Sequence, residues 1–289
     1  MQIQPHPGAG VEIRGVELAT LDDATFAAIR AQFVEHGLVF FRDQALTEAD
    51  HIAFARRLGT INVNRFFPHL PEFPEIAVVA KEPTDRGNVG GGWHTDHSYD
   101  REPALGSVLV ARELPPAGGD TWFVSMYDAF ERLPPELKER LRGMEAVHSA
   151  KHIFGSRGAL LRRVLGNTAQ YGNAAAADAL DDPTHPVVIR HPLSGREALY
   201  VNPAFTVRFA GRSLVTSLPL LLRLYWHATR PPQVAKFRWA PGSVAVWDNR
   251  ATWHYARNDY RGQRRVMHRV TLDGCGLEAG VAPDRQRHR

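Results

Sequence analysis

The sequence predicts a mainly β fold with flanking helices, arranged as a β sandwich or jelly roll. Many short segments alternate apolar and polar residues or form brief apolar runs, and glycine or proline separates them. A few longer stretches instead repeat their apolar residues at helical spacing. Strands of the same style occur along the whole chain, with no linker or internal repeat between them. We therefore expect one domain over residues 1–289.

The N-terminal part alternates between predicted strands and helices. VEIRGVEL at 11–18 alternates in polarity, and LVFF at 38–41 is a short apolar run typical of a buried strand. Residues 21–37 carry apolar side chains at helical spacing and end at a glycine. The second helix, at 47–59, begins with a capping threonine and also ends at a glycine.

The rest of the chain is predicted to contain more strands than helices. Helices are expected at 126–143 and around 213–230. Residues 60–92 and 153–185 show little periodicity, and long loops in a compact domain are often functional lids, so we expect lid-like loops there. The predicted strands cover residues 75–80, 105–113, 120–126, 186–191, 197–202, 242–249 and 264–272.

Composition argues against several classes of protein. No apolar run approaches the roughly 18 to 20 residues of a membrane span, and MQIQPHPGAG does not resemble a secretory signal. The single cysteine, Cys275, fits a reducing compartment, so a cytoplasmic location is expected. Apart from residues 284–289 the arginines are spread out, and we expect no nucleic-acid partner. A net charge of +4 suits an enzyme with a small anionic substrate.

The segment GGWHTDHSYD at 91–100 carries two side chains that can bind a metal. His94 and Asp96 are two residues apart, so in extended backbone both can point to one ion. One imidazole and one carboxylate are two ligands of a 2-His-1-carboxylate triad, which leaves positions open on Fe(II) for a cosubstrate and O2. Among 14 histidines, the best candidate for the third ligand is His254 in WDNRATWHYA.

A keto-acid cosubstrate also needs a cation for its distal carboxylate. Arg264 or Arg265 in the segment DYRGQRRVMHR can form a bidentate pair with such a group. The hydroxyl of Thr121 in GGDT can add a hydrogen bond. An H-x-D motif by itself is weak evidence, and these distant partners strengthen it considerably.

The chain resembles the TauD/TfdA family of Fe(II)- and 2-oxoglutarate-dependent dioxygenases. The motifs that carry the resemblance occur in the family's order: WHTD, ARELPPAGGDTWFVSMYDAFERL, HP-x-SGREALYVN, WDNRATWHYA and DYRGQRRVMHR. Together with the N-terminal segments GVEL and FFRDQ, the similarity covers nearly the whole chain. The resemblance implies a double-stranded β-helix, a distorted jelly roll, and a homodimer or homotetramer. It also implies Fe(II), 2-oxoglutarate and O2 as the reaction's partners, with succinate and CO2 as products.

The resemblance assigns the iron site and the cosubstrate site. His94, Asp96 and His254 would bind iron. Arg265 would hold the distal carboxylate of 2-oxoglutarate, assisted by Thr121.

The resemblance also assigns part of the substrate site. Arg269 would hold the anionic head of the substrate, and Phe205 would form an apolar wall. Trp247 and Asp248 are expected to be structural supports.

Two positions differ from the taurine-specific members of the family. Gly90 stands where those members carry an asparagine, and His97 stands where they carry a small apolar residue. His97 either lines the pocket near the anion or lies in a turn with its ring in solvent. The segment VHSAKHIFG at 147–155 resembles aryloxypropionate-cleaving members, so His152 and Phe154 could face the pocket.

The leading hypothesis is a dioxygenase that hydroxylates a small anionic substrate, with an alkyl sulfonate such as taurine favoured. An aryloxyalkanoate or alkyl sulfate dioxygenase is the alternative within the family. A metal-free jelly-roll binding module is the alternative outside it, and a zinc hydrolase would leave Arg265 and Thr121 without a role.

Overall fold

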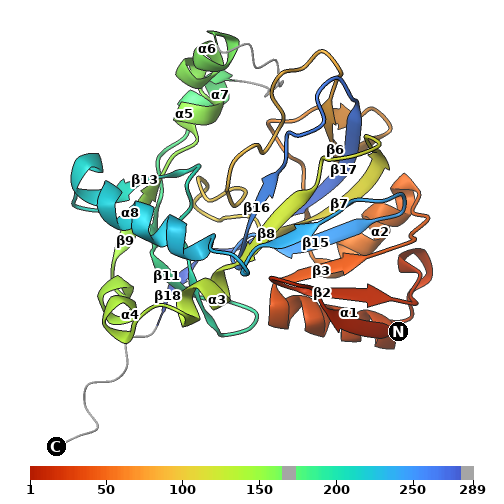
Figure 1. Cartoon of the computed structure of the whole chain (residues 1–289), viewed down its shortest axis with the longest axis horizontal. Coiled ribbons are helices and arrows are strands. Elements are labelled where there is room, and N and C mark those ends of the chain that lie inside the picture. Colours follow the sequence, from red (N-terminus) through yellow and green to blue (C-terminus); the bar gives the residue numbers. More distant parts are fainter. Residues whose placement is uncertain (165–173, 281–289) are drawn as a thin grey trace, which may run out of the picture.

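The computed structural model describes residues 1–164 and 174–280 and confirms the mainly β class. A nine-stranded sheet forms the larger layer (Figure 1). Residues 284–289, where the sequence clusters its arginines, lie outside the described part. In spatial order the sheet contains β1 (Gln2–Pro5), β2 (Val11–Arg14), β3 (Leu38–Phe41), β15 (Val244–Asp248), β7 (Gly106–Glu113), β17 (Arg265–Leu272), β6 (Phe73–Lys81) and β5 (His69–Leu70), and β4 (Ile61–Asn62) pairs with β17.

A three-stranded sheet supplies the opposing strands and completes the jelly-roll core. Between this sheet and the larger one, Phe40 stacks on Phe237 with ring centroids 4.2 Å apart. Phe123 and Met267 are fully buried in the same cluster. Alternate residues of each strand therefore face this inter-sheet space. The smaller sheet has the order β14 (Ala235–Phe237), β8 (Thr121–Ser125) and β16 (Thr252–Ala256).

Two helices cover the other face of the large sheet, as the sequence predicts. Helix α1 (Asp23–His36) ends at Gly37, whose φ of 66° lies in the left-handed region that favours glycine. Helix α2 (Glu48–Leu58) begins with a capping box, in which Thr47 and Asp50 satisfy each other's backbone N–H groups. Both helices bury apolar side chains against the sheet.

His51 of α2 gives the fold a measurable dependence on pH. Burial lowers its pKa from 6.5 to about 3, although its Nε2 lies 3.1 Å from the carbonyl oxygen of Val108. Between these two pKa values the unfolded chain binds more protons than the folded protein. The contribution of His51 to stability is therefore complete above about pH 6.5 and is lost progressively as the pH falls toward 3.

We expect His51→Gln to reduce the pH dependence of stability in this window. The slope of the unfolding free energy should fall by up to about 1.4 kcal/mol per pH unit, the value for one proton. Urea titrations of both proteins between pH 4 and pH 7 measure it. Equal slopes for the two proteins would contradict the prediction.

The remaining helices and small sheets pack beside the jelly roll. The helix expected over 126–143 is split, because Pro134 and Pro135 interrupt it; Pro135 then begins the second helix, where proline is well tolerated. The elements are η1 (Leu18–Thr20), α3 (Met126–Glu131), α4 (Pro135–Leu141), α8 (Leu214–Ala228), β9 (Glu145–His148), β10 (Thr184–Pro186), β11 (Val188–Arg190), β12 (Glu197–Leu199), β13 (Thr206–Phe209) and β18 (Glu278–Ala279).

The two segments expected to be loops contain more regular structure than predicted. Residues 60–92 include β4, β5 and β6, and the longest stretch without a strand or helix is 82–92. Residues 153–185 contain helices too short for their periodicity to be recognised, with 165–173 outside the described part. These helices lie together at one end of the molecule (Figure 1): α5 (Lys151–Phe154), α6 (Ser156–Val164) and α7 (Ala174–Asp178). None of the described helices is long and apolar enough to cross a membrane.

Candidate metal centre and substrate cavity

Backbone pairing brings the two candidate histidine ligands side by side. His94 forms an isolated antiparallel bridge with His254 of β16. Its N–H donates to the carbonyl oxygen of His254 at 3.1 Å, and the N–H of His254 donates back at 2.8 Å. The two imidazole centroids are 4.0 Å apart. Residues 160 positions apart in sequence are thus held next to each other by main-chain hydrogen bonds.

Asp96 completes a cluster that can hold one metal ion. Its Oδ1 lies 3.7 Å from His94 Nε2, and its Oδ2 lies 3.7 Å from His254 Nε2. These separations are too long for hydrogen bonds, but they suit ligands that each lie about 2.1 Å from a shared ion. All three ligand atoms lie within 4.8 Å of one another. The structure therefore brings together the three residues that the sequence selected.

Burial and a nearby charge keep Asp96 and His254 in the protonation states that metal binding needs. Burial by itself would raise the pKa of Asp96, but the Arg269 guanidinium holds that pKa well below its ordinary value. Burial lowers the pKa of His254 well below its ordinary value, so its imidazole is neutral at neutral pH. A carboxylate and neutral imidazoles are the forms that bind metal.

Neighbouring groups orient the two histidines. His94 Nδ1 donates to the carbonyl oxygen of Gly92 at 2.8 Å, which leaves Nε2 free for a metal. The ring of Trp247 lies 4.7 Å from that of His254. Gly90 has a φ of 74°, and a Cβ atom there would come within 3.1 Å of the His94 ring. The glycine at this position therefore leaves room beside the first metal ligand.

Arg265 and Thr121 lie on opposite sheets at the expected cosubstrate site. Arg265, at the start of β17, is 5% exposed, and its Nε and Nη2 have no hydrogen-bond partner. Trp239 connects the two residues: its Nε1 donates to Thr121 Oγ1 at 2.9 Å, and its ring centroid lies 5.8 Å from the Arg265 guanidinium carbon. Buried donors without a partner are rare and suit an anionic ligand. No sequence pattern indicated Trp239, because its role depends on β8 and β17 facing each other.

Arg264, the alternative to Arg265, lies on the protein surface. It forms ion pairs with Glu82 and Glu113, so it is not available to a buried carboxylate. The alternation of β17 sends neighbouring side chains to opposite faces, which decides between the two arginines.

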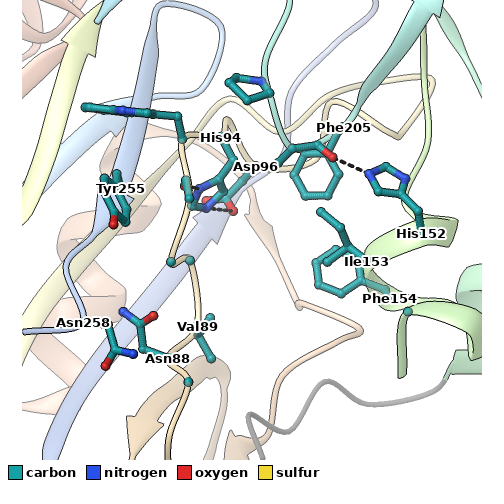
Figure 2. A pocket seen from close by; sticks show the side chains of 18 of the residues that line it. Asn88, Val89, His94, Asp96, His152, Ile153, Phe154, Phe205, Tyr255 and Asn258 are labelled. Atoms are coloured by element: carbon teal, nitrogen blue, oxygen red, sulfur yellow. Dashed lines mark hydrogen bonds and ion pairs between the residues drawn. The ribbon is translucent and has the colours of Figure 1, made fainter. Parts of the chain in front are cut away.

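A cavity of about 720 Å³ opens beside the candidate metal ligands. Arg269 lies in its wall, with Nη1 3.2 Å from Asp96 Oδ2 and with Nε and Nη2 unpartnered. Figure 2 shows Phe205 and the α5 residues Ile153 and Phe154 on one side of His94 and Asp96. The cavity thus combines one free guanidinium edge with several aromatic and aliphatic side chains.

The two further candidate histidines have different surroundings. His97, at a φ of 59°, is 2% exposed and does not line the cavity. Its Nδ1 donates to Asp100 Oδ2 at 2.8 Å, and Asn64 Nδ2 lies 3.1 Å from its Nε2. The structure thus brings His97 neither to the cavity wall nor to solvent. His152 does line the cavity, with its Nε2 donating to the carbonyl oxygen of Ala204 (Figure 2).

Asp248 belongs to a buried ion network. It is 1% exposed and accepts two side-chain hydrogen bonds from Arg250, at 2.9 and 2.6 Å. His191 Nε2 donates to the same carboxylate at 3.0 Å. The next residue, Asn249, accepts a hydrogen bond from Thr95 through its carbonyl oxygen, which ties this turn to the metal-binding segment. These contacts agree with a supporting role for Asp248.

A family model described as "Taurine catabolism dioxygenase TauD, TfdA family" matches residues 2–271. The chain belongs to the TauD/TfdA family. It is therefore a 2-oxoglutarate-dependent dioxygenase, as its relatives' names also indicate.

Relatives within the TauD/TfdA family differ in their substrates. The chain is 35% identical to an alpha-ketoglutarate-dependent sulfate ester dioxygenase of Pseudomonas putida, over all of this chain and 94% of the relative. It is 32% identical to an (S)-phenoxypropionate/alpha-ketoglutarate-dioxygenase of Sphingobium herbicidovorans, over 92% of each chain. A crystal structure of a taurine dioxygenase from Burkholderia xenovorans superimposes with a TM-score of 0.78 at 32% identity, over 98% of this chain and 93% of that one. The family resemblance and the jelly-roll fold are thereby confirmed.

Proposed function

We propose that this enzyme hydroxylates a small organic anion with an apolar chain, and that His94, Asp96 and His254 bind its Fe(II). The cavity carries the argument for the substrate, because it offers one cation, Arg269, and an apolar part of its wall formed by side chains such as Phe205, Ile153 and Phe154. An alkyl sulfate ester or a longer alkyl sulfonate fits both features. Taurine itself fits less well, since Gly90 has no side chain to bind its ammonium group.

An aryloxyalkanoate is the second candidate substrate. Aromatic rings support it: Phe67, Phe154 and Phe205 all line the cavity. Rings of this kind can pack against the aryl group of a substrate.

The residues of the chain would bind and orient the reactants. The bound iron and 2-oxoglutarate supply the oxidising chemistry when O2 is present. The Arg265 guanidinium and the Thr121 hydroxyl would hold the distal carboxylate of 2-oxoglutarate. The unpartnered Nε and Nη2 of Arg269 would bind the anionic head of the substrate. Phe205 would pack against the apolar chain of the substrate and hold the carbon next to the anionic group near the metal.

If hydroxylation occurs at a carbon bonded to the ester oxygen of a sulfate, the sulfur of a sulfonate or the oxygen of an aryl ether, the product collapses. The hydroxyl proton leaves as the carbonyl group forms, and the bond to the leaving group breaks. Sulfate, sulfite or a phenol is then released together with an aldehyde or keto acid.

Succinate formation that depends on the primary substrate tests this proposal. The enzyme is assayed with Fe(II), ascorbate and 2-oxoglutarate against alkyl sulfates, alkyl sulfonates and aryloxyalkanoates of increasing chain length. We expect turnover of alkyl sulfates or sulfonates longer than taurine, with release of sulfate or sulfite. Turnover of taurine alone would contradict the proposed role of the apolar wall. Activity with Zn(II) but not with Fe(II) would contradict the proposed iron chemistry.

Arg269→Ala should raise the KM for the anionic substrate by about 10- to 100-fold, as expected for the loss of a hydrogen bond between charged groups. The Kd of 2-oxoglutarate should change little, because Arg265 and Thr121 would hold its distal carboxylate. Steady-state kinetics and a binding titration measure the two effects. Arg269→Lys is the matched variant, since it keeps a positive charge next to Asp96. A change in 2-oxoglutarate affinity alone would mean that the two arginines have the opposite roles.

The cytoplasmic location and the homodimer or homotetramer remain predictions.

A further inference from the structure

Lys81 is a buried lysine with no hydrogen-bond or ion-pair partner among the residues that the structure describes. It is the last residue of β6, is 3% exposed, and its Nζ has no hydrogen-bond partner. Among the described residues, its ammonium group makes a cation–π contact with Tyr260, whose ring centroid lies 4.5 Å from Nζ. Lysine is almost never fully buried unless it is paired. A buried ammonium without a carboxylate partner therefore indicates a place for an anion.

The sheet register sets Lys81 directly opposite Arg265. The two residues are partners across the antiparallel pair of β6 and β17. Two residues further along, Val79 and Met267 form the next such pair on the same face, and both pack in the core between the two sheets. Lys81 and Arg265 therefore also point into the inter-sheet space, with Cβ atoms about 4.5 to 5.5 Å apart.

Two positive charges at this position need a compensating anion. Like charges directly opposite each other destabilise an antiparallel pair. Among the described residues, no carboxylate lies within ion-pair distance of Lys81 or Arg265, although Asp120 acts electrostatically on Arg265 at longer range. Arg265 Nε and Nη2 and Lys81 Nζ are all buried without a partner. The fold thus holds a cation pair that a bound carboxylate would complete.

We propose that Lys81 and Arg265 together bind the distal carboxylate of 2-oxoglutarate, and that Lys81 makes the site selective for a dicarboxylate. This inference rests on the proposed role of Arg265. A carboxylate has two oxygen atoms with about four acceptor positions, so it can accept from a guanidinium and an ammonium at once. Lys81 then acts on cosubstrate binding and not on the primary substrate, whose cation is Arg269.

The test compares two ligands that differ only at the distal group. 2-Oxopentanoate has a methyl group where 2-oxoglutarate has its distal carboxylate. Calorimetric titration of the Mn(II)-loaded protein gives a Kd for each without turnover. We expect Lys81→Met to raise the Kd of 2-oxoglutarate at least tenfold and to change that of 2-oxopentanoate less than twofold. Without ligand, the variant should melt at a higher temperature than the wild type, because a buried unpaired charge is removed.

Lys236→Met is the matched control. Lys236 lies in β14, is exposed, and its Nζ is 5.0 Å from the ring centroid of Trp122, so it has a similar aromatic contact away from the proposed site. We expect this variant to keep the wild-type Kd for both ligands.

Arg265→Met separates this inference from the proposed function. If Arg265→Met weakens 2-oxoglutarate binding but Lys81→Met does not, Lys81 only packs on Tyr260 and the inference is wrong. If neither substitution affects the Kd of 2-oxoglutarate, the cosubstrate binds elsewhere and the proposed role of Arg265 fails as well. Equal weakening of both ligands by Lys81→Met would indicate general damage to the site and would also overturn the inference.

Discussion

Asp96→Ala is expected to abolish turnover while leaving the fold largely intact. Asp96 supplies the only carboxylate of the described metal cluster, between His94 and His254. Two imidazoles without it form a weaker site with less negative charge, so metal affinity should fall sharply. We expect kcat/KM to fall at least about a thousandfold, which corresponds to about 4 kcal/mol of transition-state stabilisation.

Metal binding and folding are measured separately for this variant. Metal content after dialysis and substrate-dependent succinate formation report on the site, and circular dichroism with thermal melting reports on the fold. Some loss of stability is expected, because Asp96 lies 3.2 Å from Arg269 and its removal leaves that arginine without a buried counter-charge. Asp96→Asn, which keeps the size and one acceptor oxygen, should lose activity with a smaller loss of stability. Normal succinate production by Asp96→Ala would show that the triad is assigned wrongly.

Asp248→Ala is expected to destabilise the fold more than any other substitution considered for this protein. Asp248 and Arg250 are 1% and 2% exposed, and their hydrogen-bonded pair is joined by His191. Removal of the carboxylate leaves a buried guanidinium without its counter-charge, which costs about 3 to 5 kcal/mol of unfolding free energy. Urea denaturation measures this loss.

A double substitution distinguishes the loss of an ion pair from the loss of packing. Asp248→Asn with Arg250→Met removes both charges and retains most of the volume, so it should recover part of the stability lost in Asp248→Ala. Folded Asp248→Ala at low temperature should still bind a metal ion at His94, Asp96 and His254, because Asp248 is not one of these three candidate ligands. If Asp248→Ala unfolded at the same urea concentration as the wild type, this would contradict the view that the network supports the fold.

Secondary structure could be predicted where its signals are local, and could not where it depends on partners far along the chain. Helices α1 and α2 follow from capping residues and apolar spacing, which are local signals. The strand expected over 11–18 ends at Arg14, because Gly15 with a φ of 69° turns the chain before a short 3-10 helix. Short strands such as β13 and β14 depend on partners far along the chain, so no local pattern indicated them.

The sequence by itself determined the residue types and the order of the metal and cosubstrate motifs. His94, Asp96, His254 and Arg265 could be selected because an iron site and a keto acid require those groups, and because the motifs match a known family.

Only the tertiary structure decided which other groups share that space. The pairing of β6 with β17 places Lys81 opposite Arg265, and the indole N–H of Trp239, just after β14, donates to Thr121 of the neighbouring strand β8. His97 is held away from the cavity by Asn64 and Asp100. Each of these arrangements depends on sheet register or on side-chain packing, and neither can be predicted from the residues next to it in the sequence.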